Sequence, residues 1–170
     1  MSDGVDAAAE AILAGRAVLG IELGSTRIKA CLVGDDLETV IASGSFEWEN
    51  EFVDGVWTYS LESVWTGLRS AYADLVSDIR RRFDVIPTTF RAIGVSAMMH
   101  GYLAFGENDD LLVPFRTWRN TTTEAAASEL TELFGANIPL RWSIAHLHQA
   151  VKDAEPHVAE LRHLDRKSVV

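Results

Sequence analysis

The sequence predicts an α/β fold in which a mixed β-sheet carries helices on its faces. Residues 17–48 form three short strand-like runs separated by polar turns, whereas residues 61–83 repeat their apolar side chains at helical spacing. A further short apolar run, at 91–97, follows that helix. An antiparallel meander followed by a helical crossover to a central strand produces a mixed sheet, so this order of segments favours the α/β class.

The first segments alternate strands with tight turns. An Ala-rich stretch at 5–15 predicts a short helix ahead of the sheet. Strands are expected at 17–23 and 27–33, joined by a turn at Gly24-Ser25-Thr26. Between 40 and 48, small or apolar residues alternate with polar ones, which is typical of a strand with one covered face.

In the middle of the chain, the spacing of the apolar residues changes from that of a strand to that of a helix. Ser60 is a candidate N-cap for a helix through Phe83, with apolar residues at helical spacing along it. Residues 91–97 are expected to form a central strand. Tyr102–Phe105 and Leu111–Val113 flank a polar turn and predict a hairpin.

The last third is expected to be helical. Thr121-Thr122-Thr123-Glu124 predicts a capping box that opens a helix through Phe134, and Gly135 is placed to end it. A further helix is expected at 143–154, and residues 160–164 suggest helix and connection toward a next element.

Composition narrows the classes of partner. The chain of 170 residues has a hydrophobic fraction of 48% and a charged fraction of 24%, values typical of a globular domain with a real core. The formal net charge of −10 opposes binding to a phosphodiester backbone, so we expect no nucleic acid partner. No stretch is long and apolar enough to predict a membrane span. The sequence does not indicate an oligomeric state.

Cysteine usage and the N-terminal charges bear on location. Cys31 is the single cysteine, so no intrachain disulfide can form, which fits a reducing cytoplasm. Asp3, Asp6 and Glu10 precede the first basic residue, the wrong pattern for a secretory signal. We therefore expect a cytoplasmic protein.

The strongest chemical signal is the segment GIELGSTRIKA, residues 20–30. Glu22 lies near the end of a predicted buried strand, where a carboxylate can hold Mg²⁺ directly or through water. Gly24 permits a tight turn and close approach of a ligand, and Ser25 and Thr26 add hydroxyls to the backbone N–H groups that such a turn offers to phosphate. Lys29 could reach a terminal phosphate. Spacing alone equally allows an ordinary hairpin with a glycine turn.

This segment resembles the first phosphate motif of the actin-like sugar kinases, commonly written G-I-D-x-G-T/S-T/S-x-x-K/R. The residues that match the motif are Gly20, Ile21, Gly24, Ser25, Thr26 and Lys29. The chain is thereby similar to the FGGY family of carbohydrate kinases, in particular to xylulokinases and ribulokinases. The resemblance implies a ribonuclease-H-like (actin-like ATPase) fold and the cofactors ATP and Mg²⁺. Glu22 replaces the usual Asp, and its extra methylene shifts the carboxylate.

A second signal is SAMMHG, directly after the predicted strand at 91–97. A histidine at the carboxyl end of such a strand faces the usual ligand crevice of an open α/β sheet. A lone histidine there is more often structural, but MHG resembles the QMHG segment of xylulokinase-like members of the family. The resemblance implies that His100 lies at the sugar site.

The third signal is TWRN, residues 117–120, expected to open a helix. Trp118 beside polar groups could grip a sugar by ring packing and hydrogen bonds, although an isolated Trp is more often a core residue. The segment resembles the W-x-D of pentulose kinases, which implies sugar-binding roles for Trp118, Arg119 and Asn120. Asn120 departs from the acid of that pattern. Trp57 we assign to packing.

The remaining histidines predict no metal site. His146 and His148 are two apart on a predicted helix and do not share a face. His157 and His163 are expected to be solvated.

The resemblance covers residues 17–164, which we interpret as a partial FGGY kinase N-terminal domain after an extension at 1–16. Residues 165–170 are expected to be a non-native tail, because one back-translation of them resembles a sequencing-adapter oligonucleotide. The family's catalytic Asp is expected beyond this chain, so no catalytic residue is assigned.

The expected function is that of the N-terminal part of an ATP-dependent kinase acting on a hydroxyl of a ketopentose or related sugar, with this segment inactive alone. The sequence leaves open a non-kinase actin-like ATPase and a non-catalytic sugar- or nucleotide-binding module.

Overall fold

The computed structural model describes residues 2–165 and divides them into two compact units. The first unit comprises residues 2–49 and 61–97, and the second comprises 50–60 and 98–165. Of the expected tail at 165–170, only Asp165 lies among the described residues. No helix in the described part of the chain is long and apolar enough to cross a membrane.

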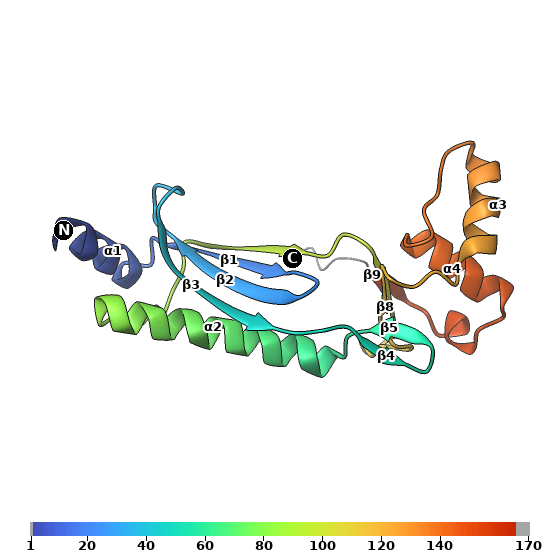
Figure 1. Ribbon diagram of the computed structural model, residues 1–170, viewed down its shortest axis with the longest axis horizontal. Coiled ribbons are helices and arrows are strands. Elements are labelled where there is room, and N and C mark those ends of the chain that lie inside the picture. The colour runs from blue at the N-terminus through green and yellow to red at the C-terminus, as the bar shows by residue number, and fades with distance from the viewer. Residues whose placement is uncertain (1, 166–170) are drawn as a thin grey trace. The chain divides into compact units, whose positions relative to one another are not determined.

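The first unit is built on a four-stranded mixed sheet of order β3-β2-β1-β6 (Figure 1). Its elements are α1 (Ser2–Leu13), β1 (Val18–Leu23), β2 (Arg27–Val33), β3 (Val40–Glu47), α2 (Leu61–Phe83) and β6 (Ala92–Ala97). β2 pairs antiparallel with β1 and β3, whereas β6 pairs parallel with β1. The expected meander and crossover are confirmed. The segment expected to be a central strand, β6, is instead at the edge of this sheet within the described residues.

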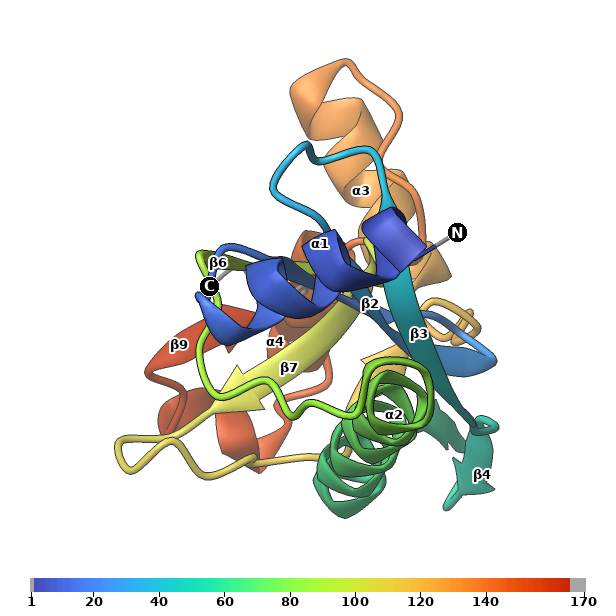
Figure 2. The same cartoon turned by 90° about the vertical axis from the view of Figure 1, so that its left-hand side faces the viewer.

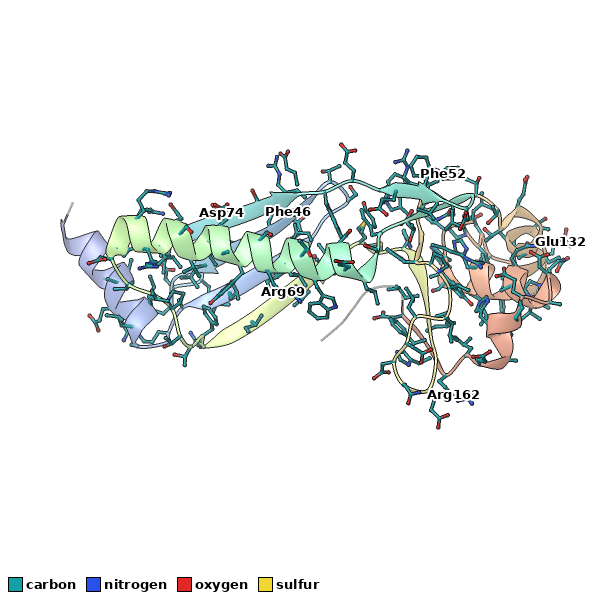
Figure 3. All side chains as sticks on the ribbon, turned by 90° about the horizontal axis from the view of Figure 1, so that it is seen from below. Phe46, Phe52, Arg69, Asp74, Glu132 and Arg162 are labelled. Atoms are coloured by element: carbon teal, nitrogen blue, oxygen red, sulfur yellow. The ribbon has the colours of Figure 1, made fainter. Side chains whose placement is uncertain are left out.

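Helix α2 lies along one face of this sheet, as the end-on view in Figure 2 shows. Gly44 of β3 permits the close approach, because a Cβ there would overlap the backbone of Ala71 and Leu75. Gly67 of the helix packs against side chains of the sheet, Ile28 of β2 and Phe46 of β3. Figure 3 looks onto α2 from outside, with Asp74 and Phe46 labelled. The Asp74 carboxylate accepts the backbone N–H of Ser45 at 2.9 Å.

The second unit contains two small sheets and three helical segments. Its strands are β4 (Glu51–Val53), β5 (Val56–Thr58), β7 (Gly101–Phe105), β8 (Arg116–Thr117) and β9 (His163–Asp165), with β4 paired to β5 and the others ordered β8-β7-β9. The helical segments are α3 (Glu124–Phe134), α4 (Ser143–Lys152) and a 3₁₀ turn, η1 (Pro156–Ala159). All the pairings in these sheets are antiparallel.

Several predicted elements of this unit are wrong. The β4–β5 hairpin was not expected, although Asp54 and Gly55 have the positive φ values, 49° and 81°, that a two-residue hairpin turn requires. The predicted strand at 111–113 is absent, since Leu111 makes only an isolated bridge to Phe105. TWRN does not open a helix: β8 ends at Thr117, and α3 begins at Glu124.

The ends of the helices also differ from expectation. The capping box predicted over Thr121–Glu124 does not form, because α3 begins only at Glu124 and its N-cap is Thr123. The Thr123 hydroxyl donates to the Leu140 carbonyl at 2.6 Å rather than capping the helix. Gly135 ends α3 in the left-handed conformation as predicted, with φ of 61°. α4 stops at Lys152, and the segment expected to continue as helix contains β9.

His157 is buried, contrary to the prediction that it is solvated. Its side chain is 4% exposed, and its ring lies 2.8 Å from the Tyr102 hydroxyl. Burial is the main cause that lowers the pKa of His157. His146 is fully buried beside Tyr102, and burial lowers its pKa to about 4, so it is neutral at neutral pH.

Candidate phosphate and sugar sites

The candidate phosphate site is built on the β1–β2 turn, which one backbone hydrogen bond closes. The Gly24 N–H donates to the Arg27 carbonyl at 3.0 Å. A Cβ at Gly24 would lie 2.8 Å from that carbonyl oxygen, so the turn requires glycine. Ser25 and Thr26 form the exposed tip. The tight glycine turn that the sequence predicted is therefore present, whereas its role in phosphate binding stays a prediction.

Glu22 and Lys29 face each other across the two strands below the turn. They are register partners, and the Lys29 Nζ lies 3.0 Å from the Glu22 Oε2. Each side chain is about half exposed, at 49% and 50%. The other carboxylate oxygen of Glu22 lies 3.5 Å from the position that a Gly24 Cβ would occupy. One carboxylate thus reaches toward both the turn and the lysine.

The same two residues belong to a polar row across the sheet. The register places Ser45, Lys29, Glu22 and Ser96 side by side on β3, β2, β1 and β6. Because successive side chains of a strand point to opposite faces of the sheet, this row lies on the face opposite α2. An open hollow of about 390 Å³ lies there, and its lining includes Gly20, Glu22, Lys29, Cys31, Gly94 and Ser96. The small side chains beside the row leave the charged pair accessible.

The donor set suits a magnesium ion that is shared with a nucleotide. Glu22 supplies a carboxylate, and Ser25 and Thr26 supply neighbouring hydroxyls. Among the described residues, no group of three or more His, Cys, Asp and Glu side chains is arranged to hold a metal ion. Mg²⁺ commonly takes one or two carboxylates together with phosphate oxygens and water rather than an all-protein cage. The hairpin fits that mode of binding.

Sequence reasoning missed Trp48, which follows β3. Its indole Nε1–H donates to the Gly24 carbonyl at 2.8 Å, and its backbone N–H donates to the Thr26 carbonyl at 3.2 Å. Trp48 is 8% exposed. The local pattern presents it only as the apolar end of a strand, and nothing in that pattern links it to a turn more than 20 residues earlier.

In the second unit, the β7–β8 ladder brings together the two segments proposed to bind sugar. Gly101 pairs with Thr117 at the end of the ladder. His100 immediately precedes Gly101 and Trp118 immediately follows Thr117, so both lie at the same end of this antiparallel pair. Trp118 is 45% exposed. Gly101 is packed against the Phe115 ring, where a Cβ would overlap it.

Arg119 and Asn120 both engage Trp57. The Arg119 guanidinium lies over the Trp57 indole, 3.8 Å from its centroid. The Asn120 amide accepts the Trp57 N–H at 2.9 Å and donates to the Trp57 carbonyl at 2.8 Å. The same amide donates to the Thr117 carbonyl at 3.0 Å. The buried Asn120 side chain thus attaches the β4–β5 hairpin to the segment after β8 through hydrogen bonds. Its role as a sugar ligand stays a prediction.

Comparison with known proteins identifies the family. Residues 17–141 match the sequence model of the N-terminal domain of the FGGY family of carbohydrate kinases. This chain therefore belongs to the FGGY family, as its phosphate motif predicted. No match to a curated protein sequence was found.

Solved structures match the fold at low sequence identity. A xyloylose kinase from Brucella ovis aligns with a TM-score of 0.73 at 21% identity, covering 87% of this chain and 32% of that protein. A xylulose kinase from Rhodospirillum rubrum aligns at 0.72 with 18% identity, covering 87% and 32%. A gluconate kinase from Lactobacillus acidophilus aligns at 0.67 with 17% identity, covering 88% and 31%.

These likenesses confirm the actin-like ATPase fold that the motif implied. The chain spans 32% of the length of the first two of these kinases. The proteins carry different substrates in their names, so the fold alone does not specify an acceptor.

Proposed function

We propose that this chain is the N-terminal part of an ATP-dependent kinase that transfers the γ-phosphoryl group to a hydroxyl of a ketopentose or related sugar. The observation that carries the proposal is the geometry of the β1–β2 hairpin. Its two strands hold a carboxylate and a lysine side by side, next to a tight glycine turn that carries two hydroxyls. Membership of the FGGY family supports the reaction class.

The hairpin contributes positioning and charge. Phosphoryl transfer needs little covalent chemistry from the protein, so catalysis comes from orientation and stabilisation of developing negative charge. In this proposal the turn at Gly24, Ser25 and Thr26 cradles phosphate oxygens and Lys29 neutralises a terminal phosphate. Glu22 would hold Mg²⁺, which supplies further charge neutralisation when bound. No residue of this chain is assigned as the general base.

The sugar that accepts the phosphoryl group would bind at the end of the β7–β8 ladder. We assign sugar contacts to His100, as a hydrogen-bonding imidazole, to the exposed ring of Trp118, and to Arg119. Asn120 belongs to the same region but is bonded to Trp57, so we propose that it shapes this site. The placing of His100 beside Trp118 favours a sugar kinase over an actin-like ATPase without a sugar substrate. We also propose a cytoplasmic location, because the cysteine usage fits a reducing compartment.

The test is Glu22→Gln in a full-length protein that contains this chain. Loss of the negative charge should lower kcat by on the order of 10²-fold or more, because Mg²⁺ loses the fixed negative charge that holds it beside the phosphates. The sugar Kd should change little. Glu38→Gln, which makes the same chemical change in the exposed β2–β3 turn, is the matched control. An unchanged kcat in Glu22→Gln would remove Glu22 from the mechanism.

A further inference from the structure

We propose that Trp48 is a positioning residue that aims the phosphate-binding turn. Trp48 directly follows β3, the strand next to β2, and donates hydrogen bonds to the carbonyls of Gly24 and Thr26, the residues on either side of Ser25. The inference rests on the proposed function of the β1–β2 hairpin and adds to it the residue that fixes the conformation of the turn.

The two hydrogen bonds define the direction of the peptide planes. The indole holds the Gly24 carbonyl at 2.8 Å, and the Trp48 backbone N–H holds the Thr26 carbonyl at 3.2 Å. A trans peptide is planar, so a carbonyl and the N–H of the next residue point in opposite directions. With the Gly24 carbonyl directed at the indole, the Ser25 N–H is directed away from Trp48. The tip of the turn therefore has a defined backbone conformation before a phosphate anion reaches it.

The turn needs an external support of this kind. Glycine has more backbone freedom than any other residue, and the tip residues Ser25 and Thr26 are exposed. Oriented donors assist a reaction most when they need no reorganisation as charge develops. Trp48 is 8% exposed, and its indole N–H is bonded to the Gly24 carbonyl. Its buried ring anchors that bond in the body of the first unit.

Trp48→Phe in a full-length protein that contains this chain is the first test, because it keeps an aromatic ring and removes the N–H. The measurement is the Kd of ATP, ADP and adenosine. We expect ATP and ADP to bind about 5- to 20-fold more weakly, the effect of losing one hydrogen bond that orients a binding group, and adenosine to bind as before. The sugar Kd should stay at the wild-type value. Trp65→Phe, on the exposed side of α2 at 57% exposure, is the matched control and should change nothing.

A second variant guards against a simple packing defect. A tryptophan analogue in which sulfur replaces the ring N–H, introduced at position 48 alone, keeps the shape of the indole and lacks the donor. It should reproduce the phosphate-dependent loss. Equal weakening of adenosine, or wild-type affinity for ATP with this analogue, would overturn the role of Trp48.

The failure of this inference can be separated from failure of the proposed function. Thr26→Val removes a hydroxyl of the turn itself. If Thr26→Val and Glu22→Gln weaken ATP and the Trp48 variants do not, the hairpin binds phosphate and Trp48 does not orient it. If none of these changes affects ATP or ADP, the hairpin is not the phosphate site, and both proposals are wrong.

Discussion

At the scale of single residues, the Glu22–Lys29 pair has a geometry that suits ligand binding better than stabilisation. Both side chains are about half exposed, and ion pairs of this kind contribute roughly 0–1 kcal/mol to stability. The pair can therefore separate at little cost when Mg²⁺ and phosphate compete for its two ends. Glu22 reaches the Lys29 ammonium with its longer side chain, whereas the family motif usually has Asp at this position. The replacement keeps the charge beside the turn and changes its reach.

Asn120 offers a sharper test at the same scale. Its amide must both donate and accept, because Trp57 presents one N–H and one carbonyl to it. An ionised carboxylate at this position could accept from the Trp57 N–H but would face the carbonyl oxygen with another oxygen. We predict that Asn120→Asp in a full-length protein weakens sugar binding by roughly 1–3 kcal/mol at neutral pH, the cost of a buried acceptor left unpaired.

The defect in Asn120→Asp should be smaller at lower pH. Protonation gives the introduced carboxyl group an O–H that can donate to the Trp57 carbonyl. Both hydrogen bonds to the Trp57 backbone can therefore form again as the pH falls through the pKa of the new group. The measurement is the sugar Kd of the variant relative to wild type across pH. Asn137→Asp, which changes an exposed Asn of the α3–α4 connection, is the matched control and should show no such trend. A pH-independent defect would show that the unmet hydrogen bond to the Trp57 carbonyl is not its cause.

At the scale of elements, the contact of α2 with the sheet depends on a glycine. A Cβ at Gly44 would overlap the α2 backbone at Ala71 and Leu75, and backbone cannot move aside as a flexible side chain can. We predict that Gly44→Ala destabilises this contact by about 1–3 kcal/mol, the usual effect of overpacking. Hydrogen exchange of α2 and β3 amides in a full-length protein would measure it.

Gly94→Ala provides the control for Gly44→Ala in the same sheet. Gly94 lies on β6, and nothing lies within 4 Å of the position that its Cβ would take. The same added methyl group should leave exchange of α2 and β3 unchanged. Equal protection in Gly44→Ala and wild type would show that α2 does not approach β3 as closely as described.

The elements that the sequence predicted are those whose signal is local. The β1–β2 turn, the apolar spacing of α2 and the helix stop at Gly135 each depend on residues adjacent in the chain or one helical turn apart. The β4–β5 hairpin was missed because its strands have three residues each, too few for a period to be visible, although the Asp54-Gly55 turn signal was present. The capping box predicted over Thr121–Glu124 is wrong, because the N-cap is Thr123 and its hydroxyl bonds the Leu140 carbonyl, 17 residues away in the chain.

The candidate sites divide in the same way. The phosphate hairpin is contiguous in sequence, so its chemistry could be inferred from residues 20–30 alone. The residues that hold the two candidate sites in place could not be inferred in this way. Trp48 bonds a carbonyl 24 residues earlier, and Asn120 bonds a backbone N–H 63 residues earlier. The burial of His157 is missed for the same reason, since its partner Tyr102 is 55 residues away. Periodicity identifies which face is covered but not which residue covers it.

At the scale of the whole molecule, the two proposed sets of binding groups lie on separate compact units. The hairpin belongs to the first unit, and the end of the β7–β8 ladder belongs to the second. Phosphoryl transfer requires donor, acceptor and base to be held together with water excluded. The chain spans 32% of the length of the two xylulose-type kinases reported above, and the family resemblance implies that the base and most adenine and ribose contacts lie outside this segment.

We therefore predict that the 170-residue chain, assayed alone, has negligible kinase turnover with any sugar. The physical reason is that a phosphate cradle without a base and without an enclosing partner surface leaves the acceptor hydroxyl unactivated and the phosphates exposed to water. A coupled assay of ADP release over a panel of ketopentoses, sugar acids and polyols measures it, with a full-length protein that contains the chain as the positive control. The full-length protein should turn over with at least one acceptor. Rates from the 170-residue chain that equal those of the full-length protein would show that its own residues complete an active site, and would place the general base among them.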